Sequence, residues 1–308
     1  MAEGVFLTPI PPRIDRAARS RMSPAEIERE YGVRVRADVA RLWTDTSIHL
    51  RLPQKSAVWK KTRQSFITGG RAAGILGYSR YTTPSKVAHE YVHGEHDFTS
   101  NSYTEFGTFY EDVCLGEWET IVAREGGYGC VILPFDFIVG NPPFAVSPDG
   151  ITTDGMLVEA KCAVTREIRA GEIPVEYERG QIQFSLHTLA NYGIHQCEFI
   201  DYEPPLSAVF PDSRLCTTRV ERDTSFDDNE AVLLRNFWDD VQEFRRGVAI
   251  PRHLAYQNAH TAEIVKQVRR NAKRPRLPHP SDEVPPPPSY FSSEYRVHRW
   301  VKEVPLRL

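Results

Sequence analysis

Cysteine is scarce in this chain of 308 residues, and the five cysteines that are present are scattered. None forms a Cys-x-x-Cys pair with another; they are Cys114, Cys130, Cys162, Cys197 and Cys216. An odd number at such spacings is neither a disulfide framework nor the ligand pattern of a zinc site or an iron–sulfur cluster. We therefore expect a reducing, intracellular environment for this protein.

A strong charge of one sign and long apolar runs are also lacking. The formal net charge is −3, which argues against a general nucleic-acid coat protein but leaves room for a local basic cleft. The sequence has no run of eighteen apolar residues and no secretory signal pattern, so we expect neither a membrane span nor secretion. Hydrophobic residues make up 41% of the chain, which is ordinary for a globular protein with a sizeable core.

The most informative stretch reads Ser-Pro-Asp-Gly at residues 147–150 and Glu-Ala-Lys at residues 159–161. Successive side chains of a β-strand alternate between faces, so Glu159 and Lys161 would point the same way. Together with Asp149 at the turn, they would bring two carboxylates and one amine to a strand end. Such a group can bind Mg²⁺ and position a water molecule. For these residues taken alone, a common turn followed by a solvated strand face remains the alternative.

Three further segments carry candidate functional side chains. Gln181 opens an apolar helical stretch, where its amide could orient water or bind a group near a phosphate. Glu111 lies within residues 105–122, whose apolar positions fit a helical period. In residues 59–77, Arg63 can clamp a phosphate with two hydrogen bonds, and it precedes a predicted helix start whose free backbone N–H groups favour phosphates. Each of these residues, considered alone, is also compatible with an ordinary surface position.

In this order, the segments resemble the YqaJ-like branch of the PD-(D/E)XK nuclease superfamily, the group that contains phage lambda exonuclease. The alkaline nucleases of herpesviruses and other large DNA viruses are similar. The resemblance extends over residues 56–245. It implies an α/β fold with a restriction-endonuclease-like core, in which helices flank a mixed central β-sheet. It also implies a Mg²⁺-dependent exodeoxyribonuclease that hydrolyses one strand of linear double-stranded DNA, 5′ to 3′, in phage or viral recombination or genome processing.

The resemblance implies a role for each residue of the motifs. The ligands of one or two Mg²⁺ ions, which Mn²⁺ could replace, would be Asp149, Glu159, the Ala160 carbonyl and Glu111. The catalytic residues would be Asp149, Glu159, Lys161, Glu111 and Gln181. The DNA phosphate would be bound by Arg63, Thr68, Gly70 and Ser147. Among these, Lys161 would orient and polarise the attacking water.

One position departs from the family pattern. Gly70 stands where phage lambda exonuclease has a serine that helps to bind the terminal 5′-phosphate, so dependence on a 5′-phosphate stays open. The alternative function is a structure-selective endonuclease, or a catalytically weak DNA-binding module, on the same fold. The implied partners are double-stranded DNA ends and a single-strand annealing protein, and the protein would be a monomer or a ring-shaped trimer. If it is viral, the host cytoplasm or nucleus would be its location.

Local sequence patterns, the extent of the resemblance and a change of composition past residue 250 together divide the chain into three segments. Residues 1–55 form a predicted N-terminal helical extension, residues 56–247 the nuclease core, and residues 248–308 a basic and proline-rich C-terminal extension. We expect residues 1–22 to be flexible. The basic run at 269–276 is compatible with a DNA-contacting tail, a nuclear-targeting signal or a solvated segment.

The spacing of apolar residues and the positions of capping and turn residues predict the following helices and strands. A capping box at Ser23 would open a helix that runs to about Trp43. Core strands are expected at 131–133, at 135–139, up to Lys161 and at 196–202. Helices are expected within 56–77, at 103–124 and at 227–246. The last helix would pack on the core through Val232, Leu233, Phe237, Val241 and Phe244.

Overall fold

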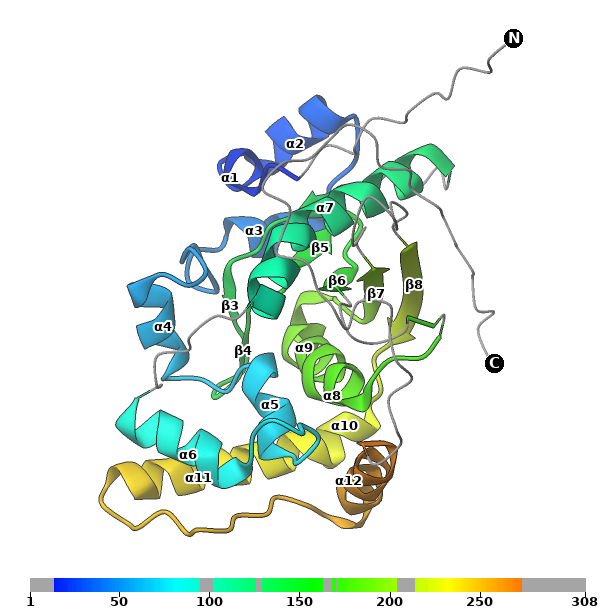
Figure 1. Cartoon of the computed structure of the whole chain (residues 1–308). Helices are drawn as coiled ribbons and strands as arrows, with labels where there is room; N and C mark the ends of the chain where they lie inside the picture. Colours follow the sequence, from blue (N-terminus) through cyan, green and yellow to red (C-terminus); the bar gives the residue numbers. More distant parts are fainter. Residues whose placement is uncertain are drawn as a thin grey trace.

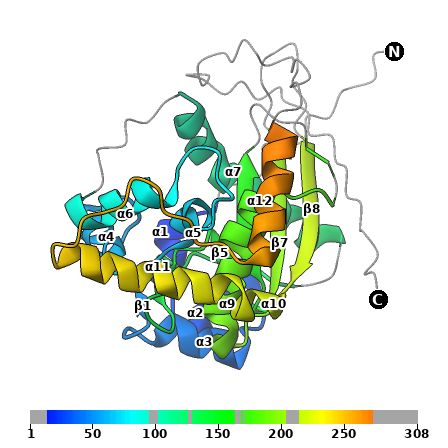
Figure 2. The same ribbon diagram turned by 90° about the horizontal axis from the view of Figure 1, so that it is seen from below.

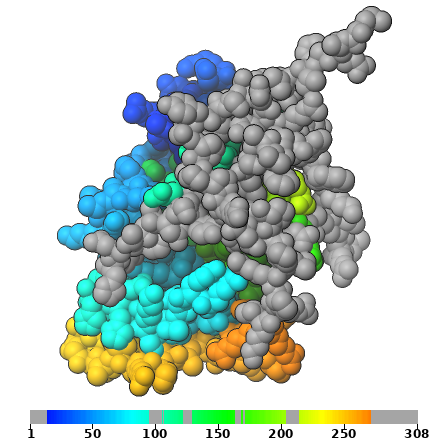
Figure 3. Space-filling model, viewed as in Figure 1, coloured from blue at the N-terminus to red at the C-terminus, as the bar shows by residue number. Residues whose placement is uncertain are grey.

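The fold is described from a computed structural model of the chain (Figure 1). The described residues are 14–94, 102–125, 129–162, 168–169, 171–203 and 214–272. The second half of the basic run at 269–276, residues 273–276, lies outside them, so the three interpretations of the run stay predictions. In Figure 3 the N-terminal helices (blue) lie at the upper edge and helix α12 (Ala259–Ala272, orange) at the lower edge.

A five-stranded mixed sheet forms the centre of the molecule (Figure 1). Its strands lie in the order β2 (Ile132–Leu133), β5 (Gly150–Thr152), β6 (Leu157–Cys162), β7 (Gln196–Glu203) and β8 (Arg214–Glu221). Strands β6 and β7 run parallel, whereas the other neighbouring pairs are antiparallel. The predicted α/β fold with a mixed central sheet flanked by helices is confirmed, as are the strands up to Lys161 and at 196–202.

The two faces of this sheet are buried in different apolar clusters. Along β6, Leu157 belongs to one cluster and Val158 to the other, as the alternation of strand side chains requires. Helix α7 (Ser102–Glu125) covers the Val158 face, and this helix confirms the prediction for 103–124. The other face is covered by η1 (Glu178–Gln183), a π-helical segment. Because Glu159 lies two residues after Leu157, its side chain points to the η1 side of the sheet.

The remaining helices surround this core. The connection from β6 to β7 contains α8 (Val175–Tyr177), η1, α9 (Phe184–Leu189) and η2 (Ala190–Tyr192). Before and after it come α4 (Ala57–Arg63), α5 (Gly69–Ile75), α6 (Pro84–His93), α10 (Ser225–Asp228) and α11 (Glu230–Arg245). Figure 2 shows α11 (yellow) running past α5 and α6, which it contacts. None of the helices in the described ranges is long and apolar enough to cross a lipid bilayer.

Helix α11 packs on the core with one correction to its predicted face. Phe237, Val241 and Phe244 are buried as predicted, but Val232 is 46% exposed. The buried apolar stripe starts with Ala231, continues with Leu234 and recurs every three or four residues, which is the spacing of one helix face. Val232 lies two residues before Leu234 and therefore points away from that face.

A second, three-stranded sheet lies beside the central one. It consists of β1 (His49–Leu50), β3 (Phe137–Val139) and β4 (Ala145–Val146), all paired antiparallel. The strand predicted at 135–139 exists, but its assignment to the core sheet is wrong. Pro134 directly follows β2, and because proline cannot donate to a strand ladder, the central pairing stops there. Strand β4 ends directly before Ser147 and so leads the chain into the Ser-Pro-Asp-Gly turn.

The capping box in the N-terminal extension is present, but the helix it opens is shorter than predicted. The Ser23 hydroxyl accepts a hydrogen bond from the Glu26 N–H at 3.3 Å, and the Glu26 carboxylate accepts one from the Ser23 N–H at 2.7 Å. Helix α2 (Pro24–Tyr31) then ends at Gly32, which has a left-handed φ of 64°. A second helix, α3 (Ala37–Thr44), follows, so the prediction of one continuous helix is wrong because the glycine terminates it.

Residues 1–22 were predicted to be flexible, and residues 1–13 lie outside the described ranges. For residues 14–22 the structure differs from the prediction. They contain a short helix, α1 (Arg16–Arg19), whose first turn is capped by the Asp15 carboxylate, which accepts from the Ala18 N–H at 2.8 Å. The Arg19 guanidinium is paired with Glu119 on α7. Contacts with a helix far along the chain therefore order this segment.

Candidate active site

The turn before β5 holds Asp149 against the neighbouring strand. Its Oδ2 atom accepts a hydrogen bond from the backbone N–H of Ala160 at 2.7 Å. Gly150 is required at the next position, because a Cβ atom there would lie 2.2 Å from the Ile132 side chain on β2. The Asp-Gly pair thus places a carboxylate directly beside β6, which carries the other two residues of the motif.

Strand β6 brings Glu159 and Lys161 together, as their spacing predicts. The Lys161 ammonium forms an ion pair with Glu159 Oε1 and donates a hydrogen bond to the Ala160 carbonyl at 3.3 Å. It also lies 5.4 Å from the centre of the Tyr177 ring, a favourable cation–π distance. The side chains of Lys161 and Glu159 are only 24% and 11% exposed. The amine is therefore fixed beside the carboxylates and largely shielded from water.

Burial and neighbouring charges shift the pKa values of Glu159 and Lys161. Burial raises the pKa of Glu159 to about 7, the Asp149 carboxylate adds to the rise, and Lys161 opposes it. For Lys161, burial by itself would lower the pKa, but the attraction of Glu159 and Asp149 prevails and raises it. Lys161 is thus an ammonium at neutral pH, whereas Glu159 titrates near neutrality. A bound cation would favour ionised Glu159, because it would offset the repulsion from Asp149.

Glu111 approaches this group from helix α7. Burial raises its pKa to about 7, Asp149 adds to the rise, and Arg16 and Lys161 oppose it. Its Oε1 atom lies 2.9 Å from Nη2 of Arg16, which comes from α1. The charge of Glu111 therefore interacts with those of Asp149 and Lys161, although Glu111 lies on a different element.

The oxygen atoms of this group form an open set of metal donors. Within the described ranges, no three His, Cys, Asp or Glu side chains are grouped so that they could hold a metal by themselves. Mg²⁺ does not need such a cage, because it commonly takes one or two protein carboxylates and completes its shell with water and substrate phosphate. Asp149 in the turn before β5, and Glu159 and the carbonyl of Ala160 on the adjacent strand β6, are hard oxygen donors, and the two carboxylates repel each other. These residues fit an open Mg²⁺ site.

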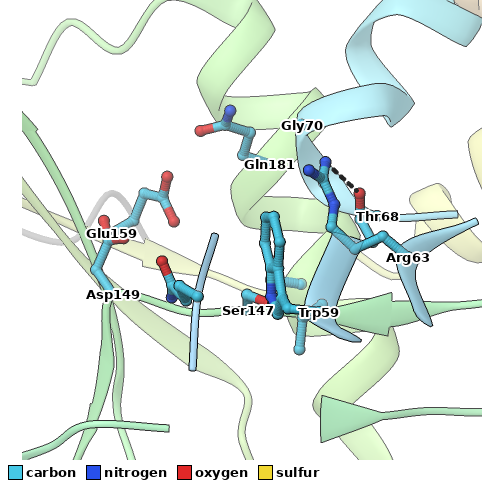
Figure 4. A pocket seen from close by; sticks show the side chains of 12 residues that line it. Trp59, Arg63, Thr68, Gly70, Ser147, Asp149, Glu159 and Gln181 are labelled. Atoms are coloured by element: carbon cyan, nitrogen blue, oxygen red, sulfur yellow. Dashed lines mark hydrogen bonds between the residues drawn. The ribbon is translucent and has the colours of Figure 1, made fainter. Parts of the chain in front are cut away.

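A second group of side chains comes from α4 and the start of α5 (Figure 4). Arg63 stacks over the Trp59 ring, with its Cζ atom 4.4 Å from the ring centre. Its Nη2 atom donates to the Thr68 hydroxyl at 3.4 Å. The indole N–H of Trp59 in turn donates to the Ser147 hydroxyl at 3.1 Å. This chain of contacts connects the predicted phosphate-binding residues to the turn that carries Asp149.

The two glutamines of the Gln-Ile-Gln sequence lie in different environments. Gln183 is tied to the sheet, because its Nε2 atom donates to the Glu221 carbonyl at 2.8 Å. The Oε1 atom of Gln181 is buried and has no hydrogen-bond partner among the described residues. The π-helix that presents Gln181 packs tightly on α5, where a Cβ at Gly180 would lie 2.5 Å from the Cβ of Ala73. The structure thus leaves the first glutamine available to a ligand.

One cavity of about 150 Å³ unites most of the predicted residues. Those in its lining are Arg63, Thr68, Gly70, Ser147, Asp149, Glu159 and Gln181 (Figure 4). The other predicted site residues, Lys161, Ala160 and Glu111, are not part of its lining. Trp59, Gln54 and Ser185 also line it and were not predicted. Trp59 could have been found, since it opens the basic segment that contains Arg63.

Arg16 is the functional candidate that sequence reasoning missed altogether. It is separated from Glu111 by 95 positions and lies in a segment predicted to be flexible. No motif or periodicity connects the two residues. Only their contact in the folded chain brings Arg16 to the edge of the site.

Comparison with known proteins finds a family model that matches the middle of the chain. Residues 58–192 match the family model of the YqaJ-like viral recombinase domain, which confirms the resemblance inferred from the motifs for this segment. The matching residues include the Ser-Pro-Asp-Gly turn, the Glu-Ala-Lys strand and Gln181. No curated protein matches the chain.

Solved structures of exonucleases are also similar to this chain. LHK-Exo in complex with dAMP is 21% identical, with a TM-score of 0.44 over 70% of this chain and 98% of that one. The alkaline exonuclease LHK-Exo from Laribacter hongkongensis is 20% identical, with a TM-score of 0.43 over the same shares. A phage related exonuclease from Haemophilus somnus 129PT is 14% identical, with a TM-score of 0.38 over 66% and 96% of the two chains.

Proposed function

We propose that this chain is a Mg²⁺-dependent exodeoxyribonuclease that hydrolyses one strand of linear double-stranded DNA, 5′ to 3′, in phage or viral recombination or genome processing. The match of residues 58–192 to the YqaJ-like viral recombinase domain supports a nuclease role in recombination. The observation that carries the proposal is a single cavity with the carboxylates of Asp149 and Glu159 and the guanidinium of Arg63 in its lining. Such a cavity can hold a cation and a phosphate group side by side.

The chain's own residues account for the needs of phosphodiester hydrolysis. Asp149, Glu159 and the Ala160 carbonyl would hold one or two Mg²⁺ ions, with Mn²⁺ accepted in their place. The bound metal would supply an acidified water and neutralise charge on the phosphate. Lys161 is a fixed ammonium that can donate a hydrogen bond to the attacking water and orient it. The Oε1 atom of Gln181, which has no hydrogen-bond partner in the described ranges, can accept a hydrogen bond from the same water.

The phosphate of the DNA strand would be bound by the second group of side chains. Arg63 is already oriented by its stacking on Trp59 and its bond to Thr68, so little freedom is lost when a phosphate binds. Its guanidinium can give a phosphate two parallel, charge-assisted hydrogen bonds. The Ser147 hydroxyl is held by the Trp59 indole and lies in the same lining. Gly70 adds no hydroxyl to the pocket.

We infer from the family resemblance that double-stranded DNA ends are the natural partner and that a single-strand annealing protein acts beside this chain. A monomer and a ring-shaped trimer are the two assemblies that the resemblance suggests. Sedimentation velocity of the full chain, with and without a DNA end, would separate them.

A cleavage experiment tests the proposed function. Linear duplexes labelled at either the 5′ or the 3′ end are digested while Mg²⁺ is titrated, with Glu159→Ala as the control. We expect metal-dependent release of mononucleotides from the 5′ label, loss of this release in the variant, and no cleavage of covalently closed circular duplex.

Two other results would contradict the proposal in different ways. Cleavage of the closed circle would indicate a structure-selective endonuclease. DNA binding without cleavage by any divalent metal would indicate a DNA-binding module on the same fold.

A further inference from the structure

The N-terminal helix α1 is built onto α7, the helix that carries Glu111. Ile14, just before α1, is 5% exposed and belongs to the apolar cluster on the α7 side of the sheet. Its backbone N–H donates to the carbonyl of Asp112 at 3.5 Å. The start of the described chain thus lies against the turn of α7 that presents Glu111.

Arg19 holds α1 in this position. Its Nη2 atom lies 2.9 Å from Glu119 Oε2, and its Nη1 atom donates to the Ile132 carbonyl at 2.9 Å. The Arg19 and Glu119 side chains are only 8% and 13% exposed. A buried, doubly bonded pair of this kind is costly to break. The docking of α1 therefore depends mainly on Arg19 and the apolar contact of Ile14.

Arg16 uses this docked helix to reach the site. Its Nη2 atom is 2.9 Å from Glu111 Oε1, and its Nε atom is 2.6 Å from Asp112 Oδ1. The two hydrogen bonds use different nitrogen atoms of the guanidinium. Asp112 therefore fixes the orientation of the planar group whose Nη2 atom binds Glu111. One oxygen of Glu111 takes part in this bond, and a carboxylate has a second oxygen with which it can bind a cation.

From this geometry we infer that Arg16 is a positioning residue of the active site. It holds the Glu111 carboxylate in the orientation in which Glu111 contributes to divalent-cation binding beside Asp149. This inference rests on the proposed function. It makes the N-terminal extension part of the active site, although that extension lies outside the segment that matches the recombinase family. The physical reason is that residues which hydrogen-bond to a metal ligand fix the orientation of that ligand. Their loss commonly weakens metal binding by roughly 10- to 100-fold.

Direct binding of Mn²⁺ to the DNA-free full chain tests the inference without any cleavage reaction. Isothermal titration calorimetry compares the wild type with Arg16→Ala, Arg16→Lys and Arg21→Ala, the last being an exposed arginine of the same segment. We expect about tenfold weaker Mn²⁺ binding in Arg16→Ala. Arg16→Lys should restore part of the affinity, and Arg21→Ala should bind as the wild type does. Unchanged or tighter binding in Arg16→Ala would overturn the inference, the tighter case indicating a guanidinium that competes with the metal.

A double-mutant cycle shows whether Arg16 acts through Glu111. In the Glu111→Ala background, Arg16→Ala should cause no further loss of Mn²⁺ affinity. The same loss in both backgrounds would contradict a positioning role. Thermal melts of each variant identify undocking of α1, for which Arg19→Ala is the reference. If the melting temperature of Arg16→Ala is as low as that of Arg19→Ala, the variant Asp112→Asn is used in place of Arg16→Ala. Asp112→Asn removes the charged carboxylate that fixes the Arg16 guanidinium, so it should still weaken Mn²⁺ binding.

The proposed function and this inference fail in different ways. If Glu159→Ala abolishes Mn²⁺ binding but Arg16→Ala leaves it unchanged, only the inference is wrong. If the wild-type chain binds no Mn²⁺ at all, both are wrong.

Discussion

The two walls of the cavity are built from different kinds of structure. The acidic wall, with Asp149 in the turn before β5 and Glu159 on the adjacent strand β6, is held by a backbone hydrogen bond of 2.7 Å. The cationic wall, with Arg63 and Thr68, lies on and between short helices and is held by ring stacking and a long hydrogen bond of 3.4 Å. Glu159 is buried, whereas Arg63 is half-buried and Gly70 exposed.

This difference teaches where the site is rigid and where it can adapt. Charges withdrawn from water interact strongly, so a change on the acidic wall alters both the charge balance and the chemistry. Charges near water are screened, and changes there cost less. We therefore expect the acidic wall to decide whether the reaction occurs, and the cationic wall to decide which DNA ends are held.

The largest effect is expected for Lys161→Ala on the acidic side. This change removes the group that would position the attacking water, but it removes little apolar packing and no residue of the cavity lining. The single-turnover cleavage rate should fall by roughly 10²- to 10⁴-fold, while DNA affinity stays close to that of the wild type. An equal loss of DNA binding and cleavage would assign Lys161 to DNA binding. It would contradict the expectation that the acidic wall decides the reaction and the cationic wall decides binding.

Arg63→Ala should have a smaller effect and a different one. It removes a charged donor from the cationic wall, so the dissociation constant for a duplex end should rise on the order of tenfold. The rate at saturating DNA should change little. Fluorescence anisotropy in EDTA measures the affinity, and Lys60→Ala, an exposed lysine of the same helix, is the matched control. A fall in the cleavage rate at saturating DNA without a change in affinity would instead assign Arg63 a role in the chemical step.

The stability of the metal-free protein should depend on pH through the acidic wall. The pKa of Glu159 is raised by burial from 4.5 to about 7, so the folded chain binds more protons than the unfolded chain between these values. Stability should therefore fall as the pH rises from about 4.5 to about 7 and remain low above that range. Glu111, whose pKa is also raised to about 7, acts in the same direction.

Thermal melts in EDTA from pH 5 to pH 8 measure this trend. We expect the melting temperature to drop by several degrees, Mg²⁺ to restore it at pH 8, and Glu159→Gln to flatten the profile. A melting temperature that rises over this range in EDTA would mean that the carboxylates are stabilised in their charged form without a metal.

The smallest effect is expected for Gly70→Ser on the cationic wall. A Cβ at this position would meet only Arg63 Nη2, at an ordinary contact distance of 3.9 Å, so a serine fits without rearrangement. Its hydroxyl would lie beside the guanidinium and could add a donor for a terminal phosphate. The ratio of cleavage rates on 5′-phosphorylated and 5′-hydroxyl ends should rise severalfold; an unchanged ratio would argue against a phosphate pocket at this place.

Patterns that depend on near neighbours were predicted well. The helix around Glu111, the strand that ends after Lys161 and the capping box at Ser23 follow from periodicity and local hydrogen bonding, and the structure contains all three. Predictions failed where a distant contact or a single residue overruled the local pattern. Gly32 divides the expected helix, and the strand at 137–139 pairs outside the central sheet because Pro134 ends the ladder.

The sequence by itself determined the pairing of Glu159 with Lys161 on one strand face, because that relation needs only the two-residue period of a β-strand. Only the tertiary structure decided that Trp59 would stack on Arg63 and face Ser147, and that Gln181 rather than Gln183 would stay available in the cavity. These relations join residues from different elements, whose meeting depends on how the whole core packs. The same holds for Arg16, whose partner Glu111 lies 95 positions away and is reached only because α1 docks on α7.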